Sequence, residues 1–187
     1  IQELAKANAN MIGIISAGSV IEMPWHHHFK ALLHTALMGQ AGAGAVLDIL
    51  SGKVNPSGKL AETYIKKYED TPSYNYYPSQ ERNSEYREGI YVGYRYFDTA
   101  GVPVNYPFGY GLSYTTFEYG NLQVKPDSVT FTLRNTGKYD GAEIAQLYVG
   151  LPGAKVFRPV KELKGFSKVF LKAGEEKNVT IKFDDKT

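Results

Sequence analysis

The sequence of 187 residues predicts a fold of mixed class, α/β followed by all-β. Two observations lead to this prediction. Residues 1–52 alternate short apolar runs with helical patterns, as in chains that build a parallel sheet covered by helices. From residue 114 onward apolar side chains recur at every second position, in segments spaced by roughly 8–12 residues, which is typical of an antiparallel β-sandwich.

The first predicted domain, residues 1–62, contains part of a parallel α/β sandwich layer. Gln2 to Asn8 is predicted to be the end of a helix, and the continuous apolar run from Met11 to Ser16 predicts a strand buried on both faces. Ala41 to Leu50 has one apolar face and predicts an amphipathic helix that Gly52 ends.

Between these elements the sequence predicts a further helix and strand. Phe29, Leu32 and Leu33 follow helical spacing, so a short helix is expected after Trp25. Thr35 to Met38 is then a candidate for a second short strand. Together these elements make a β-α-β-α run that is too short to close a sheet by itself.

The second predicted segment, residues 63–112, is rich in Tyr, Pro, Gly and charged residues and shows little periodicity. A sharp turn at Asn55 to Gly58 precedes it. Long loops inside compact proteins are usually functional or wrapped over a neighbour. Its centre, Glu85 to Thr99, carries many aromatic and aliphatic residues, which predicts an extended strand or hairpin.

The third predicted domain, residues 113–187, is an incomplete fibronectin III-like, or immunoglobulin-like, β-sandwich. Val129, Phe131 and Leu133 alternate with polar residues and predict a half-buried strand. Further strands are predicted at 143–149, at 160–171 with a bend at Gly165, and at 177–183. We expect about five strands where such a sandwich needs ~7, so an unpaired sheet edge should result.

Composition excludes several classes of function. Twenty-one Lys and Arg against 19 Asp and Glu give a net charge of +2 without a basic block, so neither nucleic acid nor an anionic membrane is an expected partner. The absence of cysteine excludes disulfides, thiolate metal sites and a cysteine nucleophile. The start at Ile1 without a leader suggests a fragment, and the compartment stays open, with a bacterial cytoplasm favoured.

Two motifs that resemble ligand sites predict none. Three consecutive histidines, His26, His27 and His28, point about 100° apart on a helix and cannot converge on one metal ion. The glycine-rich run from Gly39 to Gly44 lacks the Lys-Ser/Thr of a phosphate-binding P-loop and is better explained by close packing of a helix. No metal and no cofactor are therefore predicted.

Glycoside cleavage requires two carboxyl groups, and none here is marked as catalytic by its spacing. Seven lie in turns or in the tyrosine-rich segment: Glu22, Glu62, Glu69, Asp70, Glu85, Glu88 and Asp98. Aromatic side chains and Arg are common sugar contacts, so the substrate-adjacent candidates are Glu88, Tyr91, Tyr94 and Arg95. The alternative is structural: Arg87, Glu88 and Arg95 would form ion pairs that fix the loop.

Four ordered motifs carry a resemblance that covers nearly the whole chain: Asn55 to Leu60, Tyr86 to Asp98, Pro107 to Phe117 and Arg158 to Phe166. The run from Gly18 to Trp25 fits the same region. The sequence resembles the C-terminal half of glycoside hydrolase family 3, and within it the β-glucosidase members. The resemblance implies a (β/α)₈ barrel with an aspartate nucleophile, an α/β sandwich domain that supplies a glutamate acid/base, and a fibronectin III-like domain.

On this resemblance, residues 1–62 correspond to the end of the α/β sandwich domain and residues 113–187 to the first strands of the fibronectin III-like domain. The acid/base glutamate would precede Ile1, so no catalytic residue is expected in this chain. The implied reaction is retaining hydrolysis of terminal β-D-glucosyl residues. The implied partners are a β-linked oligosaccharide or aryl glucoside, bound by the complete enzyme, and the barrel domain of the same protein. Whether the parent is circularly permuted stays open.

A second hypothesis belongs to a different class. The chain would be a stand-alone carbohydrate-binding or protein-interaction module, built on the β-sandwich and using exposed tyrosines as a sugar platform. Open sheet edges argue against it, because buried edges need partners.

Overall fold

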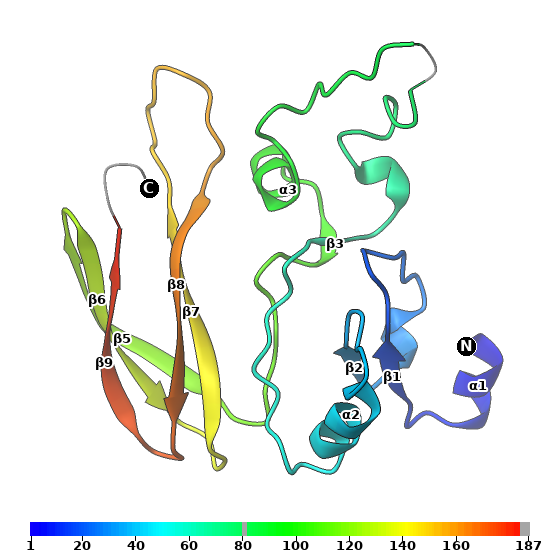
Figure 1. Ribbon diagram of the computed structural model, residues 1–187, viewed down its shortest axis with the longest axis vertical. Coiled ribbons are helices and arrows are strands. Elements are labelled where there is room, and N and C mark those ends of the chain that lie inside the picture. Colours follow the sequence, from blue (N-terminus) through cyan, green and yellow to red (C-terminus); the bar gives the residue numbers. More distant parts are fainter. Residues whose placement is uncertain (80–81, 184–187) are drawn as a thin grey trace. The chain divides into compact units, whose positions relative to one another are not determined.

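A computed structural model describes residues 1–79 and 82–183 (Figure 1). The chain divides into two compact units. Unit 1 comprises Ile1–Ser51 and Glu62–Phe108, and unit 2 comprises Gly52–Ala61 and the chain from Gly109 onward. The polypeptide thus passes from one unit to the other three times. The predicted domain boundaries at residues 62 and 112 concern the longer protein and stay a prediction.

Unit 1 contains the predicted α/β layer. Helix α1 (Gln2–Ala7) is followed by strand β1 (Ile12–Ile15), strand β2 (Ala31–His34) and helix α2 (Gly42–Leu50). The two strands are parallel, with Ile12 opposite Ala31. Val46 of α2 is buried. The prediction of a partial layer with parallel strands is therefore confirmed.

The prediction between these strands was wrong in detail. His26–His28 form a 3₁₀ helix, η1, and the helix expected from Phe29 onward is instead strand β2. Thr35 to Met38 lies beyond the end of that strand. Short apolar runs fit a helix and a strand equally well. Pairing with β1 decides the outcome, because Lys30 N donates to Met11 O and Thr35 N to Ile15 O, which extends the ladder at both ends.

The tyrosine-rich segment is closed at its base by a pair of strands. Strand β3 (Tyr64–Ile65) and strand β4 (Val104–Tyr106) are antiparallel, with Tyr64 opposite Tyr106. Between them lie the 3₁₀ helix η2 (Tyr68–Asp70) and helix α3 (Tyr94–Ala100). The backbone therefore enters and leaves the segment of residues 66–103 at one place, the β3–β4 pair.

The extended strand or hairpin predicted from Glu85 to Thr99 is wrong, because its second half is helix α3. Gly93 precedes this helix with φ 54°, and Gly101 ends it in the left-handed conformation with φ 65°. Glycine reaches both conformations without steric cost. Phe97, which is 5% exposed, anchors the helix in unit 1.

Unit 2 is a β-sandwich, as predicted. One sheet has the order β5-β6-β9, with β5 at Phe117–Lys125, β6 at Ser128–Asn135 and β9 at Glu176–Lys182. The other pairs β7 (Gly141–Val149) with β8 (Glu162–Leu171). All neighbouring strands are antiparallel.

The sandwich core contains the side chains expected from the alternating pattern. Its buried members are Val129, Phe131, Leu133, Ala145, Leu171, Val179 and Ile181. The register of β7 and β8 shifts between Leu147 and Tyr148, which face Gly165 and Leu163. The predicted bend at Gly165 thus coincides with a bulge.

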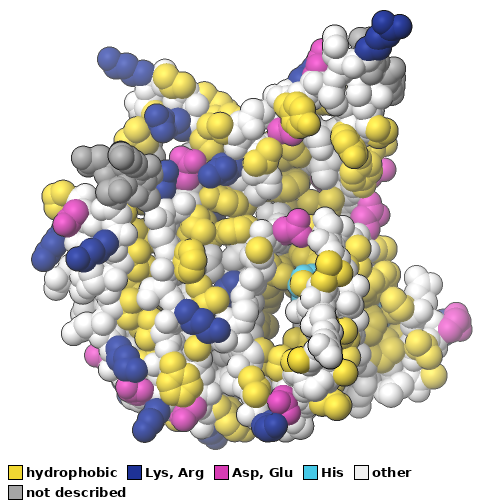
Figure 2. Space-filling view, viewed as in Figure 1, with side chains coloured by type: hydrophobic (Ala, Val, Ile, Leu, Met, Phe, Trp, Pro, Cys, Tyr) yellow, Lys and Arg dark blue, Asp and Glu magenta, His cyan; other side chains and the backbone are white. Residues whose placement is uncertain are grey.

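The visible surface shows no concentration of one charge. Lys and Arg side chains are interspersed with Asp and Glu in Figure 2. Among the residues that the structure describes, no helix is both long and apolar enough to cross a bilayer.

Candidate functional site

Glu88 and Tyr91 lie together in a turn before helix α3. The backbone N–H of Tyr91 donates to Glu88 O at 2.9 Å, and both side chains are half-buried. Tyr94 and Arg95 begin the helix. The Tyr94 ring stacks on Phe108 with centroids 4.7 Å apart, and the Arg95 guanidinium lies 5.8 Å from the centre of the Tyr94 ring. The structure therefore joins the four candidates in two adjacent pairs within unit 1.

The structural alternative for this segment needs a correction. Arg87 forms its ion pair with Glu85 instead of Glu88, and its guanidinium lies 4.5 Å from the centre of the Tyr76 ring. The Arg87 side chain is thus held by an exposed ion pair with a near neighbour and by a cation–π contact.

The histidines and Glu22 have structural partners in unit 1. His26 Nδ1 lies 2.7 Å from Met23 O, and the His26 ring packs edge-on against Tyr106. The Glu22 carboxylate accepts a hydrogen bond from Tyr68 N at the start of η2. Within residues 1–79 and 82–183, no three His, Asp or Glu side chains gather in a way that could hold a metal ion.

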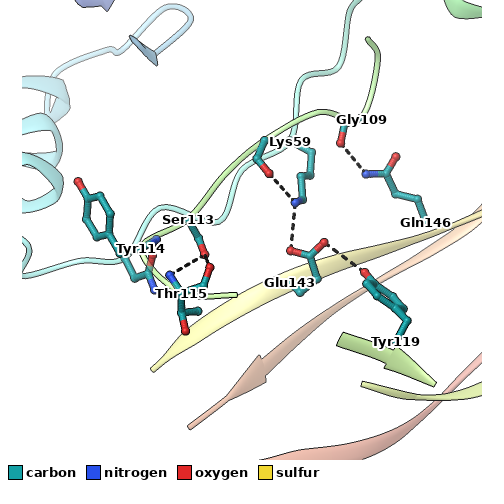
Figure 3. A network of polar contacts seen from close by, with 10 residues as sticks. Lys59, Gly109, Ser113, Tyr114, Thr115, Tyr119, Glu143 and Gln146 are labelled. Atoms are coloured by element: carbon teal, nitrogen blue, oxygen red, sulfur yellow. Dashed lines mark hydrogen bonds and ion pairs between the residues drawn. The ribbon is translucent and has the colours of Figure 1, made fainter. Parts of the chain in front are cut away.

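A polar site that sequence reasoning missed lies in unit 2 (Figure 3). Two of the recurrent motifs, Asn55 to Leu60 and Pro107 to Phe117, meet there. Leu60 N donates to Tyr110 O at 2.8 Å, and Gly109 N donates to Leu60 O at 2.7 Å. We call the paired residues 58–60 and 109–111 the strap.

Two of the three glycines in the strap, Gly109 and Gly111, are required by close approach. A Cβ on Gly111 would collide with the carbonyl oxygen of Gly58. Gly109 has φ 78°, and a Cβ there would collide with Gln146 and approach the Tyr148 hydroxyl to 2.9 Å. Gln146 Nε2 in turn donates to Gly109 O at 3.0 Å. Gly109 therefore lets the strap lie directly on strand β7.

Lys59 joins the strap to the sandwich. Its Nζ donates to Gly111 O at 2.8 Å and lies 3.0 Å from Glu143 Oε2 on β7. The Lys59 and Glu143 side chains are only 17% and 14% exposed. Such a pair must be well bonded, because desolvation of both charges is costly.

Tyr119 completes the bonding of Glu143. Its hydroxyl donates to Glu143 Oε1 at 3.1 Å, so both carboxylate oxygens have donors. Burial raises the pKa of the Tyr119 phenol, and the charge of Glu143 and this hydrogen bond raise it further. A carboxylate held by an ammonium group and a phenol is suited to fasten chain segments, because both of its oxygens are bonded within the chain.

Asn55 fastens the same motif at a second point. Its Nδ2 donates to Asp140 O at 2.9 Å, 85 residues away, and its Oδ1 accepts from Tyr114 N at 2.8 Å. These contacts join residues far apart in the sequence, so periodicity could not predict them. The only available signal was the pairing of a Pro-Ser-Gly-Lys turn with a Gly-x-Gly run.

The fold and this network describe a scaffold: an α/β layer and a β-sandwich in one chain, with a polar site whose groups bind the chain to itself. The glycosyl hydrolase family 3 C-terminal domain model matches residues 1–114, and the fibronectin type III-like domain model matches residues 143–187. The chain belongs to glycoside hydrolase family 3.

Curated relatives are similar over essentially the whole chain. Thermostable beta-glucosidase B of Acetivibrio thermocellus is 48% identical over 98% of this chain. An exo-α-(1→6)-L-arabinopyranosidase of Bifidobacterium breve is 45% identical over 100% of it. The chain spans about a quarter of the length of these relatives, 25% of each.

Solved structures give the same result. The family 3 β-glucosidase of Bifidobacterium adolescentis is 44% identical and superimposes with a TM-score of 0.95, over 99% of this chain and 28% of that one. DesR, a β-glucosidase of Streptomyces venezuelae crystallised with D-glucose, gives a TM-score of 0.92 at 40% identity, over 97% of this chain and 24% of that one.

Proposed function

We propose that this chain is the C-terminal scaffold of a retaining β-glucosidase that hydrolyses terminal β-D-glucosyl residues. The observation that supports it most is the TM-score of 0.95 to a family 3 β-glucosidase over 99% of the chain. The chain's partner would be the barrel domain of the same protein, and the complete enzyme would bind the β-linked oligosaccharide or aryl glucoside.

Three carboxylates of this chain, those of Glu22, Glu85 and Glu143, support a scaffold role. A retaining glycosidase needs a nucleophile and an acid/base about 5 Å apart, both free to react. Here Glu143 is bonded to Lys59 and Tyr119, Glu22 caps a turn, and Glu85 pairs with Arg87. In the proposal both catalytic carboxyls lie in other parts of the longer protein, and this chain orients them.

The first test uses the full-length enzyme and the 187-residue chain side by side. With 4-nitrophenyl β-D-glucopyranoside, we expect turnover by the full-length enzyme and none by the chain. Proton NMR of the first product should show the β-anomer, which is the signature of retention. Turnover by the 187-residue chain would contradict the scaffold role. Tight binding of cello-oligosaccharides by that chain would favour the stand-alone binding module.

The arabinopyranosidase relatives support a second substrate class. Two Bifidobacterium proteins with that name are 45% and 46% identical to this chain, close to the 48% of the β-glucosidase. The same assay with 4-nitrophenyl α-L-arabinopyranoside separates the two. A kcat/KM for the glucoside at least ten times that for the arabinoside is expected, and about 1.4 kcal/mol of transition-state preference corresponds to that ratio.

We also propose that Glu88, Tyr91, Tyr94 and Arg95 lie next to the substrate in the complete enzyme. The tyrosine hydroxyls can be tested without loss of ring packing, because Phe keeps the stacking of Tyr94 on Phe108. Tyr91→Phe and Tyr94→Phe should each raise KM for the aryl glucoside several-fold. Tyr86→Phe is the control, since Tyr86 lies in the same segment with 83% of its surface exposed. Unchanged kinetics in both variants would contradict the assignment.

A further inference from the structure

The chain from Lys66 to Gly89 has a composition unlike that of a typical protein–protein interface. Its apolar side chains are five tyrosines and two prolines, and it contains no Ala, Val, Leu, Ile, Met, Phe or Trp. Nine of its residues are charged. The cores of protein–protein interfaces are depleted in Lys, Asp and Glu. The composition therefore favours a ligand that meets flat rings and polar groups together.

Three of these tyrosines, Tyr68, Tyr74 and Tyr77, lie together in unit 1, and we call them the tyrosine cluster. The Tyr68 ring meets the Tyr74 ring edge-on, with centroids 5.1 Å apart and an interplanar angle of 82°. The Tyr68 hydroxyl donates to Tyr77 O at 3.4 Å. The three residues are 44%, 39% and 68% exposed, so aromatic surface is available to a ligand.

Hydrogen bonds hold the backbone that carries the cluster. Thr71 Oγ1 donates to Tyr68 O at 2.8 Å, and Tyr77 N donates to Ser73 O at 2.9 Å. The Glu22 carboxylate, 46 residues earlier in the chain, accepts from Tyr68 N. Because a tyrosine side chain has few rotatable bonds, rings on such a backbone offer contact area at a low cost in conformational entropy.

Polar side chains accompany the rings. Asn75, which follows Tyr74, is exposed, and the Arg87 guanidinium lies 4.5 Å from the centre of the Tyr76 ring. Where Figure 1 draws the chain after β3, Figure 2 shows hydrophobic side chains beside charged ones. A pyranose ring has a face of C–H groups and a rim of hydroxyls. Exposed aromatic rings next to amide and guanidinium groups match both parts of the sugar.

We propose that the tyrosine cluster is a binding surface for an oligosaccharide, with the rings of Tyr74 and Tyr77 stacking on glucose units of a β-linked chain. This inference rests on the proposed function, because the β-glucosidase reaction supplies the class of sugar. It adds to that function a group of residues that contacts the oligosaccharide chain itself.

The experiment measures binding of S-linked cellotetraose to the full-length enzyme by isothermal titration calorimetry. The thioglycosidic bonds of this probe resist hydrolysis. The variants are Tyr74→Ala, Tyr77→Ala and Tyr77→Phe. Tyr139→Ala is the control, because Tyr139 is 63% exposed and lies in unit 2, outside the tyrosine-rich segment. The Tm of each variant is measured by circular dichroism, and wild-type turnover is measured with 4-nitrophenyl β-D-glucopyranoside.

Each alanine variant of the cluster should raise the Kd for the probe roughly two- to tenfold, which is the size of one lost aromatic contact. Tyr77→Phe keeps the ring and should bind within about twofold of wild type. Tyr139→Ala should match wild type. If Tyr74→Ala fails to fold because Tyr68 loses its packing partner, the two Tyr77 variants decide.

An unchanged Kd in the alanine variants would overturn the inference. A wild-type enzyme that hydrolyses the aryl glucoside and does not bind the probe would overturn it too. A lower Tm with an unchanged Kd would instead assign the cluster to contact with another part of the longer protein. A wild-type enzyme without turnover would contradict the proposed function itself, so the two failures are distinguishable.

Discussion

The hydroxyl of Thr115 donates a 2.6 Å hydrogen bond to Asn135 Oδ1, at a place where Asn135 has no exposed surface. The same oxygen accepts from Gly137 N, and Asn135 Nδ2 donates to the carbonyls of Tyr139 and Leu171. This one amide makes four hydrogen bonds, its full set of two donors and two lone pairs. It satisfies polar groups at the end of β6 that the core would otherwise leave without partners.

Asn135→Leu should therefore destabilise the sandwich, although leucine is the more apolar residue. It leaves several buried donors and acceptors unsatisfied, and we expect the free energy of unfolding to fall by about 2–4 kcal/mol. Hydrogen–deuterium exchange of the β6 and β9 amides, with Tm as a second measurement, checks this. Asn178→Ala on the exposed face of β9 should change little. Equal effects of the two substitutions would show that the amide network contributes nothing.

Gly109→Ala should be more harmful than Gly153→Ala. Both glycines have a positive φ, 78° and 76°, so alanine at either costs roughly 1–2 kcal/mol of backbone strain. Gly153 has no atom within 4 Å of its would-be Cβ, whereas at Gly109 the Cβ meets Gln146 and Tyr148. The difference in Tm between the two variants measures the contact of the strap with β7. Equal decreases in Tm for the two variants would mean that backbone strain alone explains the effect, and that the contact of the strap with β7 adds nothing.

Asn55→Ala should loosen the chain around Tyr114. The substitution removes the acceptor for Tyr114 N and the donor to Asp140 O. We expect a loss of about 1–2 kcal/mol and faster exchange of the Tyr114 amide. Exchange resolved at single residues reports this directly. An unaltered rate for that amide would show that water replaces the side chain without cost.

The sandwich should lose stability at high pH through Tyr119. Burial first, then the charge of Glu143 and its hydrogen bond, raise the pKa of this phenol above 10.0. Above pH 10 the unfolded chain has lost the phenolic proton and the folded chain keeps it, so stability falls as pH rises. Below pH 10 the contribution of Tyr119 to the free energy of unfolding is fully present. It is lost as the pH rises from 10 toward the raised pKa of the folded chain.

Tyr119→Phe should therefore lower the slope of Tm against pH above pH 10. Tyr139→Phe is the matched control, because the Tyr139 side chain is 63% exposed. Parallel profiles for wild type and Tyr119→Phe would exclude this residue as the source of alkaline sensitivity.

The sequence predicted those elements whose apolar pattern has a single interpretation. The alternation at Val129, Phe131 and Leu133 identified β6, and all three side chains are buried in the core. The run containing Phe29, Leu32 and Leu33 was misassigned, because four residues of strand fit helical spacing as well. Helix α3 was missed because its aromatic residues favour strands. Gly93 and Gly101 at its two ends were signals for the start and the end of a helix.

The polar site around Lys59 could not be predicted for a different reason. Its residues come from segments far apart in the sequence, and no local pattern says that a lysine after a turn will meet Glu143 on β7. The sequence did identify both motifs that build the strap, but only as marks of resemblance. Their physical role, a backbone pair that glycines allow to approach and that Lys59 and Asn55 fasten, became visible in the structure.

The pairing of Tyr64 with Tyr106 has a consequence for how such enzymes diversify. Lengthening a loop whose ends are already held together costs little free energy, because the entropy of loop closure grows only with the logarithm of the number of residues. Insertions or deletions between residues 66 and 103 can therefore accumulate without disturbing the sandwich. For protein engineering, this makes the region a natural place to graft foreign sequences.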